Sequence, residues 1–170
     1  MITGINALCL LLATGLSGAT AREDLKPKLQ AIYDEADSLL LKKDVKALAK
    51  FMGETRTMDF VFEGRSGKSN LQQSVRAMFV TLAGFDKVEK AKVEVVAVAQ
   101  TGSTAVANVR TTLILKTKLI EKVVHTVEED VYGTDTWVKQ GVKWRLKLSK
   151  VVTARILTDG KPIKSGRSPS

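Results

Sequence analysis

The segment from Asp135 to Val152, DTWVKQGVKWRLKLSKVV, constrains the fold of this chain more than any other stretch. Apolar and basic side chains alternate without interruption from Val142 to Leu148, which is typical of a β-strand with one buried and one solvated face. Gln140 and Gly141 precede this strand and predict a two-residue hairpin loop. The segment is therefore predicted to form the last hairpin of a sheet.

The predicted loop also determines which residues of the hairpin face each other. With Gln140 and Gly141 in the loop, Trp137 is expected opposite Trp144, and Asp135 opposite Leu146. Both indole rings and the carboxyl group of Asp135 would then lie on the apolar side of the sheet.

The first 21 residues, MITGINALCLLLATGLSGATA, have the pattern of an export signal. The apolar stretch from Ala7 to Leu16 is too short to span a bilayer, and Ala19-Thr20-Ala21 is typical of a cleavage site. We therefore expect a periplasmic or secreted protein, with a buried first helix as the alternative. No later stretch predicts an integral membrane segment, and the only cysteine, Cys9, lies within the signal.

The chain is basic, with 27 Lys and Arg against 18 Asp and Glu, a formal net charge of +9. On the predicted last strand the basic residues alternate with apolar ones, which is typical of a solvated face. Two Trp, two Tyr and five Phe offer few aromatic rings on which bases could stack. Nucleic acid is therefore not expected as a partner, whereas weak attraction to anionic envelope surfaces is.

Three helices are predicted before the long strands. Apolar residues at helical spacing predict a long amphipathic helix from Glu23 to Leu41. Asp44 is a good N-cap for a short second helix that Gly53 would close. After a short strand, Asp59 to Glu63, a capping box of Ser69 and Gln72 predicts the start of a third helix, which ends at Gly84.

The second half of the chain is predicted to be a curved meander. The expected strands run from Val88 to Ala99, from Thr104 to Lys116, and from about Val123 to Val138, the last with a bulge at Gly133. Helices followed by antiparallel strands indicate an α+β domain over residues 22–157. Residues 158–170 are expected to form a basic tail that is ordered only at its beginning.

The order of these elements, with the motifs KKDV, DFVFE and DTWVKQGVKWRL, resembles the NTF2-like superfamily, and in particular its SnoaL-like or DUF4440-type exported members. The resemblance covers roughly Leu25 to Val152. It implies a cone, in which a curved antiparallel sheet wraps around the long N-terminal helix and encloses a pocket. The implied functions are binding of a small apolar ligand in the pocket, or assembly into a homodimer through the open face of the sheet.

The resemblance extends to ketosteroid isomerase, which implies roles for two acids. Glu63 matches the position of the general base, and Asp135 matches the acid that hydrogen-bonds the oxyanion. The position of the catalytic tyrosine is matched by Ala36, and Tyr33 lies nearly one turn away. Without that donor, catalysis is not expected, and an isomerase or lyase that uses Glu63 and Asp135 is the alternative.

Other side chains are candidates for the pocket lining: Tyr33, Phe62, His125, Trp137 and Trp144. Each candidate also has a purely structural interpretation. A role in the core is the more usual explanation for the two tryptophans, and helix capping or solvent exposure would explain Glu63. Asp135 is explained by an ion pair with one of three basic residues: Arg145, Arg110 or Lys139.

No metal or cofactor is expected. His125 is the only histidine, and the predicted mature chain holds no cysteine. The sequence GRSGKS, which starts at Gly64, ends like a phosphate-binding loop, but Phe62 stands where such a loop needs its first glycine.

Overall fold

The computed structural model describes residues 24–118 and 123–163. The predicted export signal and the end of the predicted tail lie outside these residues. None of the helices in the described ranges is long and apolar enough to cross a membrane.

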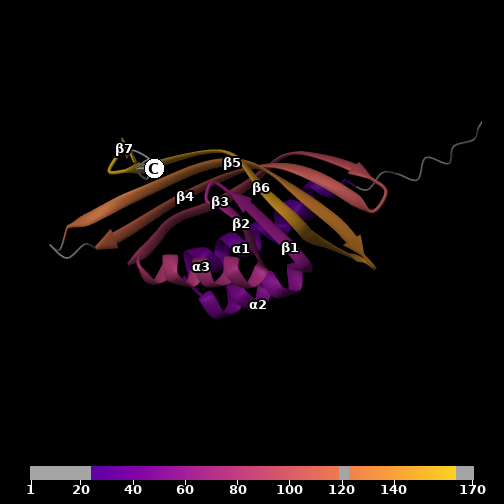
Figure 1. Cartoon of the computed structure of the whole chain (residues 1–170), viewed down its shortest axis with the longest axis horizontal. Helices are drawn as coiled ribbons and strands as arrows, with labels where there is room; N and C mark the ends of the chain where they lie inside the picture. Colours follow the sequence, from indigo (N-terminus) through magenta and orange to yellow (C-terminus); the bar gives the residue numbers. More distant parts are fainter. Residues whose placement is uncertain (1–23, 119–122, 164–170) are drawn as a thin grey trace, which may run out of the picture.

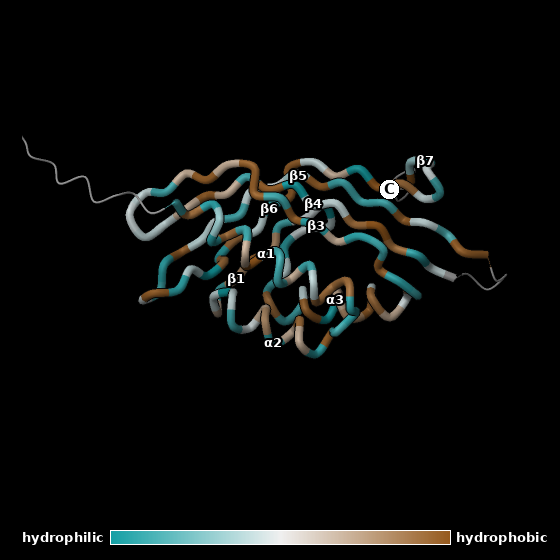
Figure 2. The backbone as a smooth tube through the Cα atoms, turned by 180° about the vertical axis from the view of Figure 1, so that it is seen from behind, coloured by the Kyte–Doolittle hydropathy of each residue, from teal (hydrophilic) through white to brown (hydrophobic). Residues whose placement is uncertain are grey.

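Three helices pack beneath one curved sheet (Figure 1). The helices are α1 (Leu25–Leu41), α2 (Val45–Thr55) and α3 (Leu71–Ala83). The strands are β1 (Arg56–Gly64), β2 (Gly67–Asn70), β3 (Lys87–Thr101), β4 (Thr104–Lys118), β5 (Val124–Gln140), β6 (Lys143–Thr158) and β7 (Lys161–Pro162). The strand order is β2-β1-β6-β5-β4-β3, with β7 paired to β6. Hydropathy alternates along the long strands (Figure 2), as expected for a sheet that buries one face. The α+β class is confirmed.

The sheet is mixed, whereas an antiparallel sheet was predicted. β1 runs parallel to β6, with Val61 beside Leu148 and Glu63 beside Lys150, and the other pairings are antiparallel. Short loops reveal the direction of neighbouring strands, but β1 and β6 are far apart in the sequence, so no turn signals their relative direction.

The register of the last hairpin differs by one residue from the prediction. Its loop consists of Gly141 and Val142, and Gly141 adopts a left-handed conformation with φ of 61°. Trp144 therefore lies opposite Lys139, and Trp137 opposite Leu146, so the predicted direct pair of tryptophans is wrong. Both indoles still face the core, because Trp137 and Trp144 are only 1% and 9% exposed.

The moved loop alone would bring Asp135 opposite Leu148 instead of the predicted Leu146. A second register shift, between Thr136 and Trp137, moves its partner one residue further, to Ser149. A further shift next to Gly133 confirms the predicted bend there, but the extra residue, Val152, is on β6. The two backbones approach closely at this point, because a Cβ atom on Gly133 would lie 2.7 Å from the carbonyl oxygen of Lys150.

Two predicted helix boundaries also shift. α2 continues through Gly53 to Thr55, and the capping box of α3 is formed by Asn70 and Gln73, one residue after the predicted pair. Asp44 caps α2 as predicted, because its carboxylate accepts a hydrogen bond from Ala47 N at 2.9 Å.

α1 covers the free edge of β3. The amide of Gln30 donates to Val93 O at 2.7 Å and accepts from Val95 N at 2.8 Å. The carboxylate of Asp37 accepts from Val93 N at 2.8 Å. These bonds pair backbone groups that an edge strand would otherwise leave open to another chain. They also fix the rotation of α1, so that its apolar face is directed beneath the sheet.

The buried residues form two clusters. The first lies between α1, β1 and the hairpin end of the sheet, and contains Leu25, Leu29, Tyr33, Phe60, Val95, Ala105, Ala107, Val109, Trp137, Trp144 and Leu146. The second lies toward the other end, beside α2 and α3, and contains Leu48, Met52, Leu82, Val88, Ala91 and Leu115.

Candidate functional site on the concave face of the sheet

Asp135 is a buried acid in the first cluster. Alternation along β5 directs Gly133, Asp135 and Trp137 to the concave face, where the helices pack. Asp135 lies beside Ala107 of β4 and is only 3% exposed. A buried carboxyl group requires hydrogen-bond partners, and they come from elements far away in the sequence.

The direct partner of Asp135 is Tyr33 of α1, whose hydroxyl donates to Asp135 Oδ2. Tyr33 follows Leu29 by four residues and therefore shares its buried helix face. The Tyr33 ring also meets Trp137 edge-on, with ring centroids 5.6 Å apart and planes at 89°. α1 and β5 thus meet through one polar contact and one aromatic contact.

Burial pushes both members of this pair toward their neutral forms. It raises the pKa of Asp135, although the hydroxyls of Ser149 and Tyr33 and the positive charge of Arg56 act in the opposite direction. Burial also raises the pKa of Tyr33 well above its usual value, and the adjacent Asp135 carboxylate raises it further.

Two buried polar atoms beside this pair lack a hydrogen-bond partner of standard geometry among the described residues: Asp135 Oδ1 and Trp137 Nε1. The Ser149 side chain is close enough to Asp135 to lower its pKa, and the Trp137 side chain is close enough to Tyr33 to lower its pKa. However, Asp135 Oδ1 does not reach hydrogen-bond geometry with Ser149, and Trp137 Nε1 does not reach it with Tyr33. Most buried polar atoms in proteins are paired, so this unused capacity marks the cluster as a candidate site.

Arg56 adds a positive charge to the cluster. It is the first residue of β1, beside Leu146, and its guanidinium carbon lies 4.3 Å from the centre of the Phe60 ring. The side chain is half-buried, and burial lowers its pKa, while the charges of Asp135 and Tyr33 act in the opposite direction. Its guanidinium group forms no hydrogen bond or ion pair with any residue that the structure describes. The sequence analysis missed Arg56, because its only signal was a basic residue before the predicted strand.

Glu129 is a second acid on the concave face that the sequence analysis missed. It lies between Val127 and Val131, opposite Leu113 and Ile156, and is half-buried. Burial raises its pKa, and its carboxylate contacts no donor or cation in the described part of the chain. Glu129 is separated from Asp135 by six positions, roughly 20 Å along an extended strand.

Most of the predicted pocket residues come together. Tyr33, Trp137 and Trp144 belong to the first cluster, and Phe62 packs against it. Asp135 contacts Tyr33 rather than one of the three proposed basic partners. One of those, Arg110, forms two hydrogen bonds of 2.9 Å with Asp130 instead.

Glu63 does not join this group. Its neighbour Phe62 packs against the core, so Glu63 faces the convex side, where its carboxylate lies 4.0 Å from the ammonium groups of Lys68 and Lys150. Glu63 and Asp135 therefore lie on opposite faces of the sheet and cannot reach one ligand atom together.

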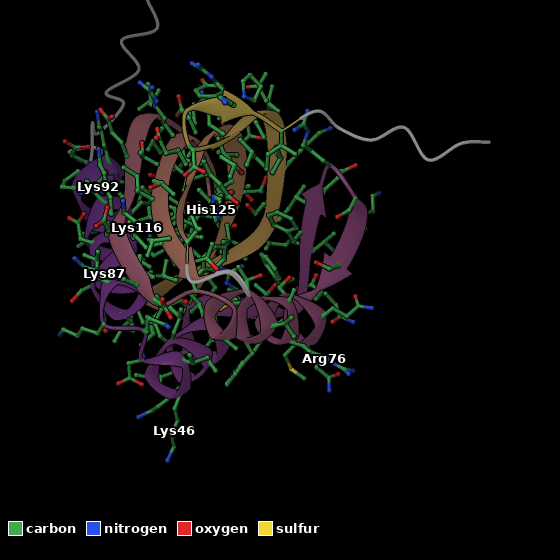
Figure 3. All side chains as sticks on the ribbon, turned by 90° about the vertical axis from the view of Figure 1, so that its left-hand side faces the viewer. Lys46, Arg76, Lys87, Lys92, Lys116 and His125 are labelled. Carbon is green, nitrogen blue, oxygen red and sulfur yellow. The ribbon has the colours of Figure 1, made fainter. Side chains whose placement is uncertain are left out.

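His125 lies far from the first cluster, near the start of β5. In the end-on view of Figure 3 it is located beneath the arch of strands, on the side of α3. His125 Nδ1 lies 2.5 Å from Asp159 Oδ2, and Asp159 Oδ1 accepts from Thr126 N at 2.8 Å. This contact joins β5 to the turn before β7.

Two cavities lie outside the first cluster. One, of about 440 Å³, is lined by Lys90, Lys92, Glu94, Arg110, Thr112, Ile114, Glu128, Glu129, Asp130, Arg155 and Leu157. The other, of about 380 Å³, is lined by Asp34, Asp37, Ser38, Leu41, Lys42, Ala91 and Lys92. Within the described ranges, no group of three or more His, Cys, Asp or Glu side chains could hold a metal ion.

No family model and no curated protein matches the sequence. Solved structures do match. The Kfla4162 protein from Kribbella flavida has a TM-score of 0.60 at 10% identity, over 75% of this chain and 91% of that one. An NTF2-like superfamily protein from Salmonella enterica has a TM-score of 0.56 at 15% identity, over 84% and 94%. A protein of unknown function with a cystatin-like fold from Nostoc punctiforme has a TM-score of 0.54 at 16% identity, over 86% and 95%. With its N-terminal helix packed on a curved mixed sheet, this chain has the NTF2-like, or cystatin-like, fold.

Proposed function

We propose that the concave face of the sheet binds a small, mainly apolar ligand that donates a hydrogen bond to Asp135. The observation that carries this proposal is Asp135 Oδ1, a buried carboxylate oxygen without a partner of standard geometry in an otherwise apolar cluster. An unpaired buried acceptor costs about 1–3 kcal/mol, so a ligand that brings a donor would recover part of that free energy.

The surroundings support a ligand that is otherwise apolar. The ring of Tyr33 lies next to Asp135 and meets that of Trp137, and Phe62 packs against the same cluster. Farther along the concave face, Val131 and Ile156 are only partly buried, so apolar surface continues toward the open end of the sheet. Small-molecule sites typically combine such surface with a few polar groups that orient the ligand.

An isomerase or lyase is the second candidate. It is favoured by the contact between Tyr33 and Asp135, because a neutral Asp135 that accepts from the Tyr33 hydroxyl could donate its own proton to an oxyanion. Such a reaction also needs a base close to the same ligand atom. Glu63 faces the other side of the sheet, and Glu129 is roughly 20 Å away along β5. Binding without catalysis is therefore the better supported function.

We also propose that the domain is exported to the periplasm or the medium, because residues 1–21 have the apolar segment and the cleavage pattern of an export signal. Mass spectrometry of protein purified from the producing cells would test it. The expected N-terminus is Arg22, and an intact N-terminus in a cytoplasmic fraction would contradict export.

Calorimetric titration with 2-naphthol and 2-methoxynaphthalene tests the binding proposal. Both probes are flat and apolar, but only 2-naphthol can donate to Asp135 Oδ1. We expect 2-naphthol to bind about fivefold to tenfold more tightly, which corresponds to one net hydrogen bond.

The matched variant combines Tyr33→Phe with Asp135→Val. It removes both polar partners together, so that neither is left buried and unpaired. In this variant the two probes should bind with equal affinity. Equal affinity in the wild-type protein, or no binding of either probe, would overturn the proposal.

A further inference from the structure

We infer that Arg56 binds an acidic group of the ligand, which makes the ligand an apolar carboxylic acid. This inference rests on the proposed binding function and names the chemical class of the ligand. No sequence pattern distinguishes Arg56, and only its surroundings in the fold indicate this role.

Arg56 is held at the margin of the first cluster. Its backbone N–H closes the end of α2 by donating to Met52 O, and its backbone pairs with β6 beside Leu146. Its guanidinium group stacks over Phe60, which is almost fully buried. The side chain is therefore held between the buried Tyr33–Asp135 pair and solvent, where a ligand on the concave face could reach it.

The positive charge of Arg56 is not neutralised locally. Asp135 and Tyr33 are the ionisable groups that act on it, but neither forms an ion pair or hydrogen bond with it. Both groups are also shifted toward their neutral forms. A half-buried guanidinium without an anionic partner offers several N–H donors to a ligand, and the planar fork of arginine matches a carboxylate in two parallel hydrogen bonds.

A purely structural role is the competing explanation. The stacking of Arg56 on Phe60 is a cation–π contact, which stabilises proteins by about 0.5–2 kcal/mol. That role predicts lower stability when Arg56 is replaced, but no change in the preference between acidic and neutral ligands. The ligand preference is therefore the decisive measurement.

The experiment compares 2-naphthoate with 2-naphthol on three proteins: the wild type, Arg56→Met and Arg145→Met. Methionine keeps the apolar contact with Phe60 but removes the charge. Arg145→Met is the control for net charge, because Arg145 lies between the inward-facing Trp144 and Leu146 and so faces the opposite side of the sheet.

We expect the wild type and Arg145→Met to prefer 2-naphthoate over 2-naphthol by at least about tenfold, and Arg56→Met to lose this preference while it retains 2-naphthol within about twofold. If Arg56→Met fails to fold by circular dichroism, Arg56→Lys replaces it. Lysine keeps the charge without the fork, so the preference should fall to an intermediate value.

Two failures can be told apart. If 2-naphthol binds the wild type but 2-naphthoate binds no more tightly, the role of Arg56 is wrong and the proposed binding function stands. If neither probe binds the wild type, both are wrong. An unchanged preference in Arg56→Met would also overturn the inference.

Discussion

At the scale of single residues, β5 carries two acids on its concave face whose surroundings differ. Asp135 has the Tyr33 hydroxyl, the Ser149 hydroxyl and the charge of Arg56 nearby, whereas only burial shifts the pKa of Glu129. Burial raises the pKa of both acids, but only for Asp135 is the rise opposed by donors and a cation. Glu129 is therefore the simpler test of what an unpaired acid costs this fold.

Glu129→Gln is expected to stabilise the protein at neutral pH. Folding raises the pKa of Glu129, so the folded state binds more protons than the unfolded state, and stability falls as pH rises from about 4.3, the ordinary pKa of Glu, through the raised folded value. The loss is about 1.4 kcal/mol for each unit of the rise. Urea unfolding at several pH values measures it.

The exposed Glu35→Gln controls for the change in net charge. If the free energy of unfolding of Glu129→Gln above pH 6 is no higher than that of this control, Glu129 is not an unpaired acid that destabilises the fold.

The sequence predicted which of these side chains face the interior better than it predicted their partners. Helical spacing placed Tyr33 on the apolar face of the first helix, and strand alternation placed Asp135 and Trp137 on the apolar side of the sheet. The contact between Tyr33 and Asp135 depends on how far α1 is rotated and shifted along β3. The hydrogen bonds of Gln30 and Asp37 set that position, and no local sequence pattern reveals it.

At the scale of elements, the curvature of the sheet depends on the close approach of β5 and β6 at Gly133. Gly133→Ala should destabilise the protein by about 1–3 kcal/mol, because the new Cβ atom would lie 2.7 Å from the backbone oxygen of Lys150. Gly53→Ala is the matched variant. Nothing lies within 4 Å of a Cβ there, and Gly53 is inside α2, so this change should stabilise by about 0.5–1 kcal/mol.

Thermal and urea unfolding of both variants measure these opposite effects. A Gly133→Ala variant as stable as the wild type would show that the backbones separate at little cost, and that the sheet does not need glycine to bend.

The same region shows why element boundaries were easier to predict than pairing. Turn residues and periodicity located every long strand, but the register depends on which strand carries each extra residue. The predicted bend at Gly133 is present, although Val152 of the partner strand supplies the bulge. A shift of one residue in the hairpin loop was enough to replace the predicted Trp137–Trp144 pair while leaving both rings on the same face.

At the scale of the whole molecule, the order of three helices followed by a long-stranded meander was sufficient to predict the NTF2-like fold. The parallel pairing of β1 with β6 was not predictable, because it joins segments without a common turn. The convex face remains a candidate homodimer surface on the sequence argument alone. The labelled basic side chains Lys46 and Arg76 extend from the helices away from the sheet (Figure 3), so part of the positive charge lies on the helical side of the molecule.

The groups around Asp135 predict how ligand binding depends on pH. The groups that face Asp135 are Tyr33 from α1, Arg56 from β1 and Ser149 from β6, and Arg56 is the only cation among them. Since burial raises the pKa of Asp135, the acid is more often neutral than an ordinary aspartate, and a bound carboxylate would raise its pKa further. Binding of 2-naphthoate therefore takes up a proton, and its affinity should fall with rising pH, by roughly tenfold in total for each unit by which the ligand raises the pKa of Asp135.

Calorimetry between about pH 5 and pH 8, over which an ordinary carboxylic acid is ionised, measures both the affinity and the proton uptake. 2-Naphthol remains neutral over this range and should show a smaller dependence. If the affinity for 2-naphthoate does not change with pH and no proton is taken up, the acid and the carboxylate do not share the site.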